Sequence, residues 1–263
     1  MFIHLVVNGT SHTVEAAPSD KLLNVLRRLG YFSVKHGCET GECGACAVRL
    51  DGRLVNSCLL LAAQADGHSI QTVENLGEHP QQGWRVTSGL HALQEAFVES
   101  GAIQCGYCTP AQLLAACELL EVNPDPTEEQ VRQALDGVLC RCTGYLKPVE
   151  AVLRAAAYLR GEAPTPGSSP AAGAFEPEAG AADDLSGPLS TRTLPRVQPQ
   201  IRVTPETKAY SSVGKPERKV DALKLVQGKP AFAADVEKRG MLVAKVLHSP
   251  HAHARIKFID TAR

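Results

Sequence analysis

Two stretches within the first 60 residues have the pattern of apolar and polar positions that is typical of β-hairpins. Ile3–Val7 is a short apolar strand, an Asn-Gly pair at positions 8–9 favours a tight turn, and His12–Glu15 supplies the returning strand. The same pattern recurs at Ala47–Leu50 and Arg53–Asn56, which an Asp-Gly pair separates. The pattern therefore predicts two β-hairpins near this end of the chain.

Between the two hairpins, the apolar positions change to the period of a helix. Ser19 or Asp20 is predicted to cap this helix, and Gly30 is predicted to end it in a left-handed conformation. Residues 36–46 contain three glycines and three cysteines, a composition that excludes regular structure. The order hairpin, helix, loop, hairpin is typical of a small β-grasp domain of the ferredoxin type over residues 1–78. The predicted apolar face of the helix consists of Leu22, Leu23, Val25, Leu26 and Leu29.

Helical periodicity governs residues 79–160. One apolar face runs from Leu90 to Phe97, and a second helix is predicted from Thr109, because the proline that follows it loses no hydrogen bond at the first helical position. Thr127 begins a third helix, and Val149–Leu159 forms a fourth. These patterns predict a compact four-helix domain whose cysteines lie where helices begin or end.

Residues 161–212 differ in composition from the rest of the chain. They hold eight of the 17 prolines, with many Gly, Ala and Ser. Such a segment buries too little apolar surface to offset its ordering entropy, so we predict an extended linker. Patterned sequence returns in residues 213–263, where Met241–Leu247 and Ala254–Ile259 are predicted strands. About 50 residues is marginal for an independent fold, so we expect this segment to belong to a larger domain.

Charge and hydropathy exclude several classes of protein. The formal net charge is −1, which favours neither nucleic acid nor an anionic membrane as a partner. The first residues lack a basic segment and a long apolar run, so no signal peptide is predicted. No segment approaches the roughly 20 apolar residues that a membrane-spanning helix needs. The expected location is the cytoplasm, where clustered cysteines are more often metal ligands than disulfides.

Eight of the nine cysteines fall into two groups with close spacing. In the first quartet, three cysteines follow the pattern Cys-x4-Cys-x2-Cys, the spacing of a plant-type [2Fe–2S] site that a distant fourth cysteine completes. Glycines at positions 37, 41 and 44 allow the backbone to fold tightly and to direct its amides inward. Zinc or paired disulfides are the alternatives, but zinc knuckles have different spacings. The first quartet comprises Cys38, Cys43, Cys46 and Cys58.

The second quartet is less diagnostic by itself. A Cys-x2-Cys pair is followed after 31 residues by a Cys-x-Cys pair, and a zinc knuckle is a fair alternative for this pattern. Beside a plant-type site, a second iron–sulfur cluster is the better interpretation, because two clusters in series can connect a buried redox centre to an outside acceptor. The ninth cysteine, Cys117, falls on an apolar helix face and is predicted to be a small buried side chain. The second quartet comprises Cys105, Cys108, Cys140 and Cys142.

Three motifs carry a resemblance to a known family. They are the run from Cys38 to Cys46, Gln-Cys-Gly-Tyr-Cys-Thr-Pro at 104–110, and Cys-Arg-Cys-Thr-Gly-Tyr at 140–145. Over residues 1–160, the chain is similar to the iron–sulfur subunit of the molybdenum hydroxylases, the xanthine dehydrogenase and aldehyde oxidoreductase family. The resemblance implies an outer cluster, nearer the flavin, at the first quartet and an inner cluster, nearer the molybdopterin, at the second.

The same resemblance implies a contact with the pterin. Gln104 would lie against it through its side-chain amide, and Cys142 would lie there as a ligand of the inner cluster. An exposed or helix-capping amide is the alternative for Gln104. No catalytic residue is assigned to this chain, because the family keeps its glutamate base in a region that this sequence lacks.

Residues 213–263 resemble a different subunit of the family. Val-Gly-Lys-Pro at 213–216 and Ser-Pro-His-Ala-His-Ala-Arg at 249–255 are similar to the opening of the molybdenum-binding subunit. The resemblance implies a partial α/β, hammerhead-like segment. The 52 residues of 161–212 are too few for a flavin domain, so FAD is expected on another partner chain.

The sequence as a whole predicts an α+β chain: β-grasp 1–78, helical domain 79–160, linker 161–212 and incomplete segment 213–263. The predicted function is the electron-transfer subunit of a molybdenum hydroxylase. Electrons would pass singly from a molybdopterin centre on a partner chain, through two [2Fe–2S] clusters, to flavin or another acceptor. A purine, another N-heterocycle or an aldehyde is the expected substrate. A free ferredoxin-like carrier and a zinc-stabilised scaffold are the alternatives.

Overall fold

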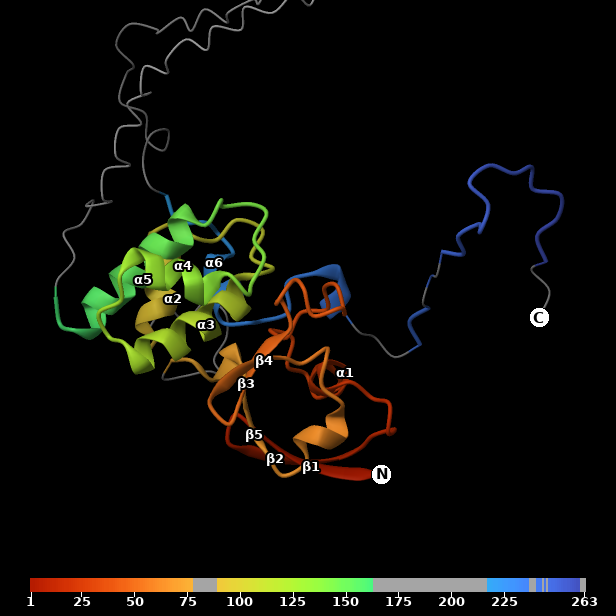
Figure 1. The fold of residues 1–263 in the computed structure, drawn as a ribbon, viewed down its shortest axis with the longest axis horizontal. Coiled ribbons are helices and arrows are strands. Elements are labelled where there is room, and N and C mark those ends of the chain that lie inside the picture. Colours follow the sequence, from red (N-terminus) through yellow and green to blue (C-terminus); the bar gives the residue numbers. More distant parts are fainter. Residues whose placement is uncertain (78–88, 163–216, 237–239, 243, 245, 261–263) are drawn as a thin grey trace, which may run out of the picture. The chain divides into compact units, whose positions relative to one another are not determined.

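Figure 1 shows the protein as a computed structural model, which describes residues 1–77, 89–162, 217–236, 240–242, 244 and 246–260. Residues Met1–Ala231 form one compact unit and Phe232–Arg263 a second. The predicted boundary at 78 and nearly all of the predicted linker, from 163 onward, lie outside the described residues.

A five-stranded mixed sheet forms the first part of the larger unit, and its strand order is β2-β1-β5-β3-β4 (Figure 1). Both predicted hairpins are confirmed: β1 pairs with β2 and β3 with β4, each antiparallel. The central strand β5 runs parallel to β1 and antiparallel to β3, which joins the two hairpins into one sheet. The strands are β1 (Phe2–Val7), β2 (Thr10–Glu15), β3 (Ala47–Leu50), β4 (Arg53–Asn56) and β5 (Ser69–Gln71).

The helix α1 (Leu22–Arg28) packs its apolar face into the core of this sheet. The predicted cap is wrong: Lys21 precedes the helix, and no side chain caps it. Asp20 instead accepts hydrogen bonds from the backbone N–H of Ala17, at 3.2 Å, and from the guanidinium of Arg28, at 2.9 Å. Gly30 has a φ of 92°, as the predicted left-handed end requires.

The strand β5 and two short 3-10 helices, Ala62–Ala65 and Val73–Asn75, were not predicted from the sequence. A strand of three residues is too short to display an alternating pattern. Its position is decided by the two hairpins on either side, which supply partners for its backbone. The pairing is therefore a tertiary effect.

Four helices form the second part of the larger unit, as predicted. Thr127 caps α4 by accepting a hydrogen bond from the N–H of Gln130 at 3.3 Å. The helix α5 begins three residues earlier than predicted, after Tyr145 in a left-handed conformation, with φ 65°. The helices are α2 (Ala92–Glu99), α3 (Thr109–Val122), α4 (Glu128–Leu135) and α5 (Leu146–Leu159).

The sheet and the helices meet along α3, which contacts β3 and β4. Arg49 of β3, whose side chain is largely buried, donates to Glu121 of α3 at 2.7 Å and to the carbonyl of Gly52. Glu118 of the same helix accepts a hydrogen bond from the backbone N–H of Leu54 at 3.0 Å. Cys117 is buried beside this ion pair, which confirms its predicted burial.

The two strands predicted at Met241–Leu247 and Ala254–Ile259 are wrong. The described residues of both segments have no strand structure, and Leu242 and Leu247 are almost fully exposed. A strand gains stability only from neighbouring strands and a covered face, and the described part of this unit supplies neither. In the described ranges, no helix is both long and apolar enough to cross a membrane.

Candidate metal centres

Three cysteines of the first quartet lie in the loop between α1 and β3, and the fourth, Cys58, follows β4. Cys38 and Cys43 form two hydrogen bonds with each other: the backbone N–H of each donates to the sulfur of the other, at 3.4 Å. The N–H of Thr40 also donates to the sulfur of Cys38 at 3.4 Å. Hydrogen bonds from the Thr40 side chain and from these amides lower the pKa of Cys38 to about 6. The loop therefore stabilises a thiolate at this position.

The other two thiols of the first quartet are buried. Cys46 and Cys58 are each 2% exposed, and their side chains interact with one another. Burial raises the pKa of Cys46 to about 11. Hydrogen bonds therefore favour the thiolate form of Cys38, while Cys46 would need a bound cation to hold its sulfur ionised.

Glycines bring the backbone close to the sulfur atoms. A Cβ at Gly37 would lie 2.6 Å from the sulfur of Cys43. Gly41 has a φ of 84°, and a Cβ there would lie 2.5 Å from the Leu59 side chain. The sequence indicated tight packing from these glycines, and the structure supports it with both close approaches and positive φ angles.

The second quartet has one exposed and one inner pair. Cys105 and Cys142 are exposed, and their side chains interact. Cys108 is buried at the N-terminal end of α3, and its side chain interacts with that of Cys140. Burial raises the pKa of Cys108 and, to a smaller extent, that of Cys105. Burial of Cys140 acts to raise its pKa, but hydrogen bonds from Thr143, Cys142 and Cys108 together outweigh that burial and lower the pKa.

The side chains of Thr143 and Tyr145 hold the loop around Cys140. The hydroxyl of Thr143 lies 3.1 Å from the Cys140 sulfur. The hydroxyl of Tyr145 accepts a hydrogen bond from the Cys140 N–H at 2.8 Å and donates one to the carbonyl of Val138 at 3.1 Å. Tyr145, three residues after Cys142, has a left-handed backbone, and the sequence alone does not reveal such a conformation.

The loops of the two quartets touch. The N–H of Leu139 donates to the carbonyl oxygen of Cys43 at 2.9 Å, and Leu139 is bonded covalently to Cys140. The hydroxyl of Tyr107, beside Cys108, donates to the carbonyl of His36 at 2.7 Å. A ligand loop of one part of the fold is therefore hydrogen-bonded directly to a ligand loop of the other.

The thiols meet in pairs within each quartet. Across the described ranges, no three His, Cys, Asp or Glu side chains are grouped closely enough to hold one metal ion. A tetrahedral zinc site requires four ligands around one ion. A [2Fe–2S] cluster requires two thiolates on each of two irons, with sulfide between them. The paired arrangement fits the second requirement.

Gln112 supplies a second observation that fits a cluster. Its side chain is 0% exposed, and neither its nitrogen nor its oxygen has a hydrogen-bond partner among the described residues. It follows Cys108 by one turn of α3, and long side chains on a helix point back over the preceding turn. A buried amide without a partner is costly, and cluster sulfur atoms can accept its hydrogen bonds.

Gln104 is exposed and directly precedes Cys105, whose side chain interacts with Cys142. The two residues that the family resemblance assigns to the pterin thus lie at the exposed end of the second quartet. Neither is enclosed by the described part of the chain.

The two parts of the fold match two known domain families. Residues 5–71 match the family described as "2Fe-2S iron-sulfur cluster binding domain", and residues 72–153 match the "[2Fe-2S] binding domain" family. The small FeS subunit of nicotinate dehydrogenase from Eubacterium barkeri is 46% identical over 146 residues, which are 55% of this chain and 88% of that one.

Solved structures give the same result. Quinoline 2-oxidoreductase from Pseudomonas putida 86 has a chain that is 41% identical, with a TM-score of 0.55, and the match covers 62% of this chain and 98% of that one. Aldehyde oxidoreductase from Desulfovibrio desulfuricans is 42% identical, with a TM-score of 0.56 over 61% of this chain. The match covers only 17% of that longer polypeptide.

The fold and the two domain matches place the protein in the class that carries two [2Fe–2S] clusters. Within that class, the chain belongs to the iron–sulfur subunits of the molybdenum hydroxylases. It is an electron-transfer subunit of an oxidoreductase complex, and its two matched domains each bind a [2Fe–2S] cluster. A free carrier and a zinc scaffold are not favoured.

Proposed function

We propose that this chain conducts single electrons between a molybdopterin centre on a partner chain and a flavin or another acceptor. The second quartet, Cys105, Cys108, Cys140 and Cys142, would hold the inner cluster. The first quartet, Cys38, Cys43, Cys46 and Cys58, would hold the outer cluster. The clusters supply one-electron redox chemistry when bound. The polypeptide provides the thiolates, excludes water from part of each site and sets the distance between them.

The hydrogen bond from Leu139 to Cys43 is the observation that supports this proposal most directly. It joins the residue beside Cys140 to a cysteine of the first quartet through one N–H···O contact of 2.9 Å. Electrons would therefore cross between the two sites through bonded atoms and one short hydrogen bond. A zinc scaffold would have no use for such a connection between its sites.

The exposed end of the second quartet would face the molybdopterin. Gln104 and Cys142 are both exposed there, which leaves them accessible to a cofactor on another chain. The Cys38 end of the first quartet, which is only partly covered, would face the flavin on a further chain. The names of the relatives include nicotinate, quinoline and aldehyde. An N-heterocycle, a purine or an aldehyde is therefore the proposed substrate class.

The domain division from the sequence remains part of the proposal. Residues 1–78 and 79–160 would each hold one cluster, 161–212 would act as a linker, and 213–263 would open the molybdenum-binding subunit. The unpaired, exposed apolar residues of 240–260 favour the idea that a partner completes that segment. A cytoplasmic location is proposed from the thiolate-rich sites.

The proposal can be tested on the assembled complex. Anaerobically purified material should carry about four irons for each copy of this chain, should be red-brown and should elute with a molybdenum-containing partner. Addition of an N-heterocyclic or aldehyde substrate should bleach both clusters, one electron each. A colourless chain that binds zinc, or a coloured chain that always elutes alone, would contradict the proposal.

Substitution of Gln112 should change one cluster and spare the other. Gln112→Leu removes the amide that lies one turn after Cys108, so the inner cluster loses a hydrogen-bond donor and its reduction potential should fall by tens of millivolts. Potentiometric titration followed by electron paramagnetic resonance measures both potentials separately. Gln133→Leu, at an exposed position on α4, is the matched control and should change neither. Equal potentials in wild type and Gln112→Leu would show that the amide does not reach the cluster.

A further inference from the structure

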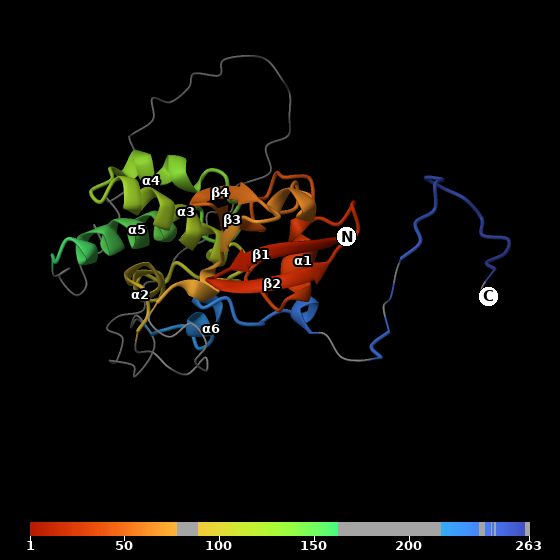
Figure 2. The same ribbon diagram turned by 90° about the horizontal axis from the view of Figure 1, so that it is seen from below.

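Residues 217–231 lie back against both parts of the iron–sulfur fold, although the sequence predicted only the start of another domain there. We name this segment the docking strap. It contains a short helix, α6 (Ala222–Val226), which contacts α2 and α3 (Figure 2). The strap belongs to the same compact unit as the sheet and the four helices.

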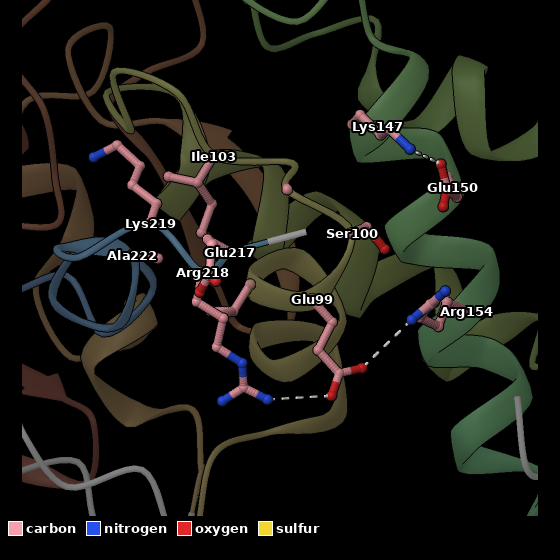
Figure 3. Close-up of a pocket in the computed structure, with 12 residues that line it drawn as sticks. Glu99, Ser100, Ile103, Lys147, Glu150, Arg154, Glu217, Arg218, Lys219 and Ala222 are labelled. Atoms are coloured by element: carbon pink, nitrogen blue, oxygen red, sulfur yellow. Dashed lines mark hydrogen bonds and ion pairs between the residues drawn. The ribbon is translucent and has the colours of Figure 1, made fainter. Parts of the chain in front are cut away.

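The first contact of the strap is polar. Arg218 lies 3.6 Å from Glu99 at the end of α2, and the other oxygen of Glu99 lies 3.6 Å from Arg154 of α5 (Figure 3). The start of the strap, α2 and α5 together line a cavity of about 450 Å³. The Arg218 side chain is mostly exposed, so this pair orients the strap and adds little affinity.

The second contact is apolar and reaches the second quartet. Leu225 is 3% exposed and Val226 is 0% exposed. Leu225 rests on Gly106, between Cys105 and Cys108: a Cβ at Gly106 would lie 2.5 Å from the leucine Cδ1. The buried amide of Gln94 on α2 donates to the carbonyl of Val226 at 2.9 Å. The strap therefore covers the backbone of a ligand loop.

The third contact reaches the sheet domain. Gly228 has a φ of 71°, and a Cβ there would lie 2.6 Å from the Cβ of Ser33 and 2.7 Å from Val73. Glu74 lies in the same crevice and accepts hydrogen bonds from the N–H and the hydroxyl of Ser33. Only a residue without a side chain, in a left-handed conformation, enters this crevice.

The helix in the strap depends on these contacts. Five residues form little more than one turn, and helices of that length are not stable by themselves in water. Its apolar side chains are buried against other elements and not against one another. An ordered α6 is consequently a sign of docking.

We propose that the surface beneath the strap, formed by Gln94, Gly106 and the Ser33–Val73 crevice, is a peptide-docking site. Its occupant is the 217–231 segment of this chain, anchored by Leu225 and Gly228. The site fastens the polypeptide that follows to both iron–sulfur domains, without help from residues 163–216. This inference goes beyond the proposed function, because it does not depend on bound iron or on the identity of a partner.

Hydrogen–deuterium exchange of the full chain tests the docking. The N–H groups of Gly228 and Lys229 donate to carbonyls of α6. They should exchange more than about tenfold more slowly than in an unstructured peptide. Exchange at the unstructured rate in wild type would overturn the proposal.

Two variants identify the anchors. Leu225→Asp should abolish protection over residues 222–229 and increase exchange at Gly106, whereas Leu247→Asp, at a 96% exposed leucine, should change neither. Gly228→Ala should also release the strap, because its Cβ would collide with Ser33. Gly240→Ala is the control, since Gly240 has a similar φ, 78°, with nothing within 4 Å. Full protection in both Leu225→Asp and Gly228→Ala would overturn the assignment of anchors.

Cutting the chain tests whether the site acts without its covalent connection. A protease recognition sequence is inserted between residues 163 and 216 and cleaved to completion under native conditions. Residues 217–263 should then elute with residues 1–162 from a sizing column, and Leu225→Asp should release them. Release of the wild-type fragment would show that the docking site does not hold its occupant by itself.

Discussion

Replacement of Cys43 by serine is expected to remove one of the two paramagnetic signals that the reduced protein displays and to leave the other. Cys43 is a ligand of the proposed outer cluster, and iron loses one of its four thiolates in this variant. Iron content should fall from about four to about two for each chain. Electron paramagnetic resonance of the dithionite-reduced protein, with metal analysis, measures both quantities.

Two further variants complete this experiment. Cys108→Ser should remove the opposite signal, because Cys108 belongs to the second quartet. Cys117→Ser is the matched control: Cys117 is equally buried but lies beside Arg49 and Glu121, outside both quartets. It should retain both signals. Loss of both signals in Cys43→Ser, with the Cys108→Ser protein unaffected, would mean that the thiols are not divided into two independent sites.

Replacement of Gly44 by alanine is expected to cause the largest loss of stability of any glycine substitution near the sites. Gly44 has a φ of 66°, and a Cβ there would lie 1.9 Å from the carbonyl oxygen of Gly137 in the loop before Cys140. The backbone fixes the position of that Cβ, and the oxygen it meets is itself a backbone atom, so neither can rotate away. Strain and overlap together should cost at least about 3 kcal/mol.

Thermal unfolding, followed by the loss of visible absorption, measures this effect. A cost of about 3 kcal/mol corresponds to a fall in the midpoint of roughly 6–12 °C for a unit of this size. Gly67→Ala is the control, because Gly67 has a φ of 78° but open space around it, so it should show only the backbone cost of about 1 kcal/mol. Similar midpoints for the two variants would mean that the ligand loops do not touch at Gly44.

The contact at Gly44 has a consequence for electron transfer. The same two loops carry the hydrogen bond from Leu139 to Cys43. A side chain at position 44 would therefore separate the loops across which electrons are proposed to pass. In Gly44→Ala protein that remains folded, reduction of the outer cluster by substrate should therefore lag further behind reduction of the inner cluster than it does in wild type.

Much of the fold was readable from local patterns. Both hairpins and the starts of α3 and α4 follow from features within a few residues, such as turn pairs, Pro110 and the Thr127 cap. The cap predicted for α1 was wrong, because the carboxylate of Asp20 accepts a hydrogen bond from the guanidinium of Arg28 instead of capping the helix. The strands predicted in the final segment failed because apolar residues alone do not supply a neighbouring strand.

The candidate sites could be predicted from the sequence to a similar extent. Cysteine spacing predicted two [2Fe–2S] sites, and the domain matches agree. The hydrogen bonds of Thr143 and Tyr145 were not predicted, because the first depends on a contact with a sulfur atom and those of Tyr145 on a left-handed backbone that the sequence does not reveal. Gln112 was missed because its burial becomes apparent only once the helices are packed.

The sequence by itself predicted the ligands and determined the order of most elements and the class of cofactor, because each of these depends on residues close together in the chain. Tertiary structure alone decided which thiols pair, how Cys43 meets Leu139, and where Leu225 and Gly228 dock. Those contacts join residues separated by up to about 200 positions, and no periodicity or spacing encodes an interaction at that range. These contacts are determined by burial, by hydrogen bonding and by close packing that only a glycine permits, all of which exist only in the folded chain.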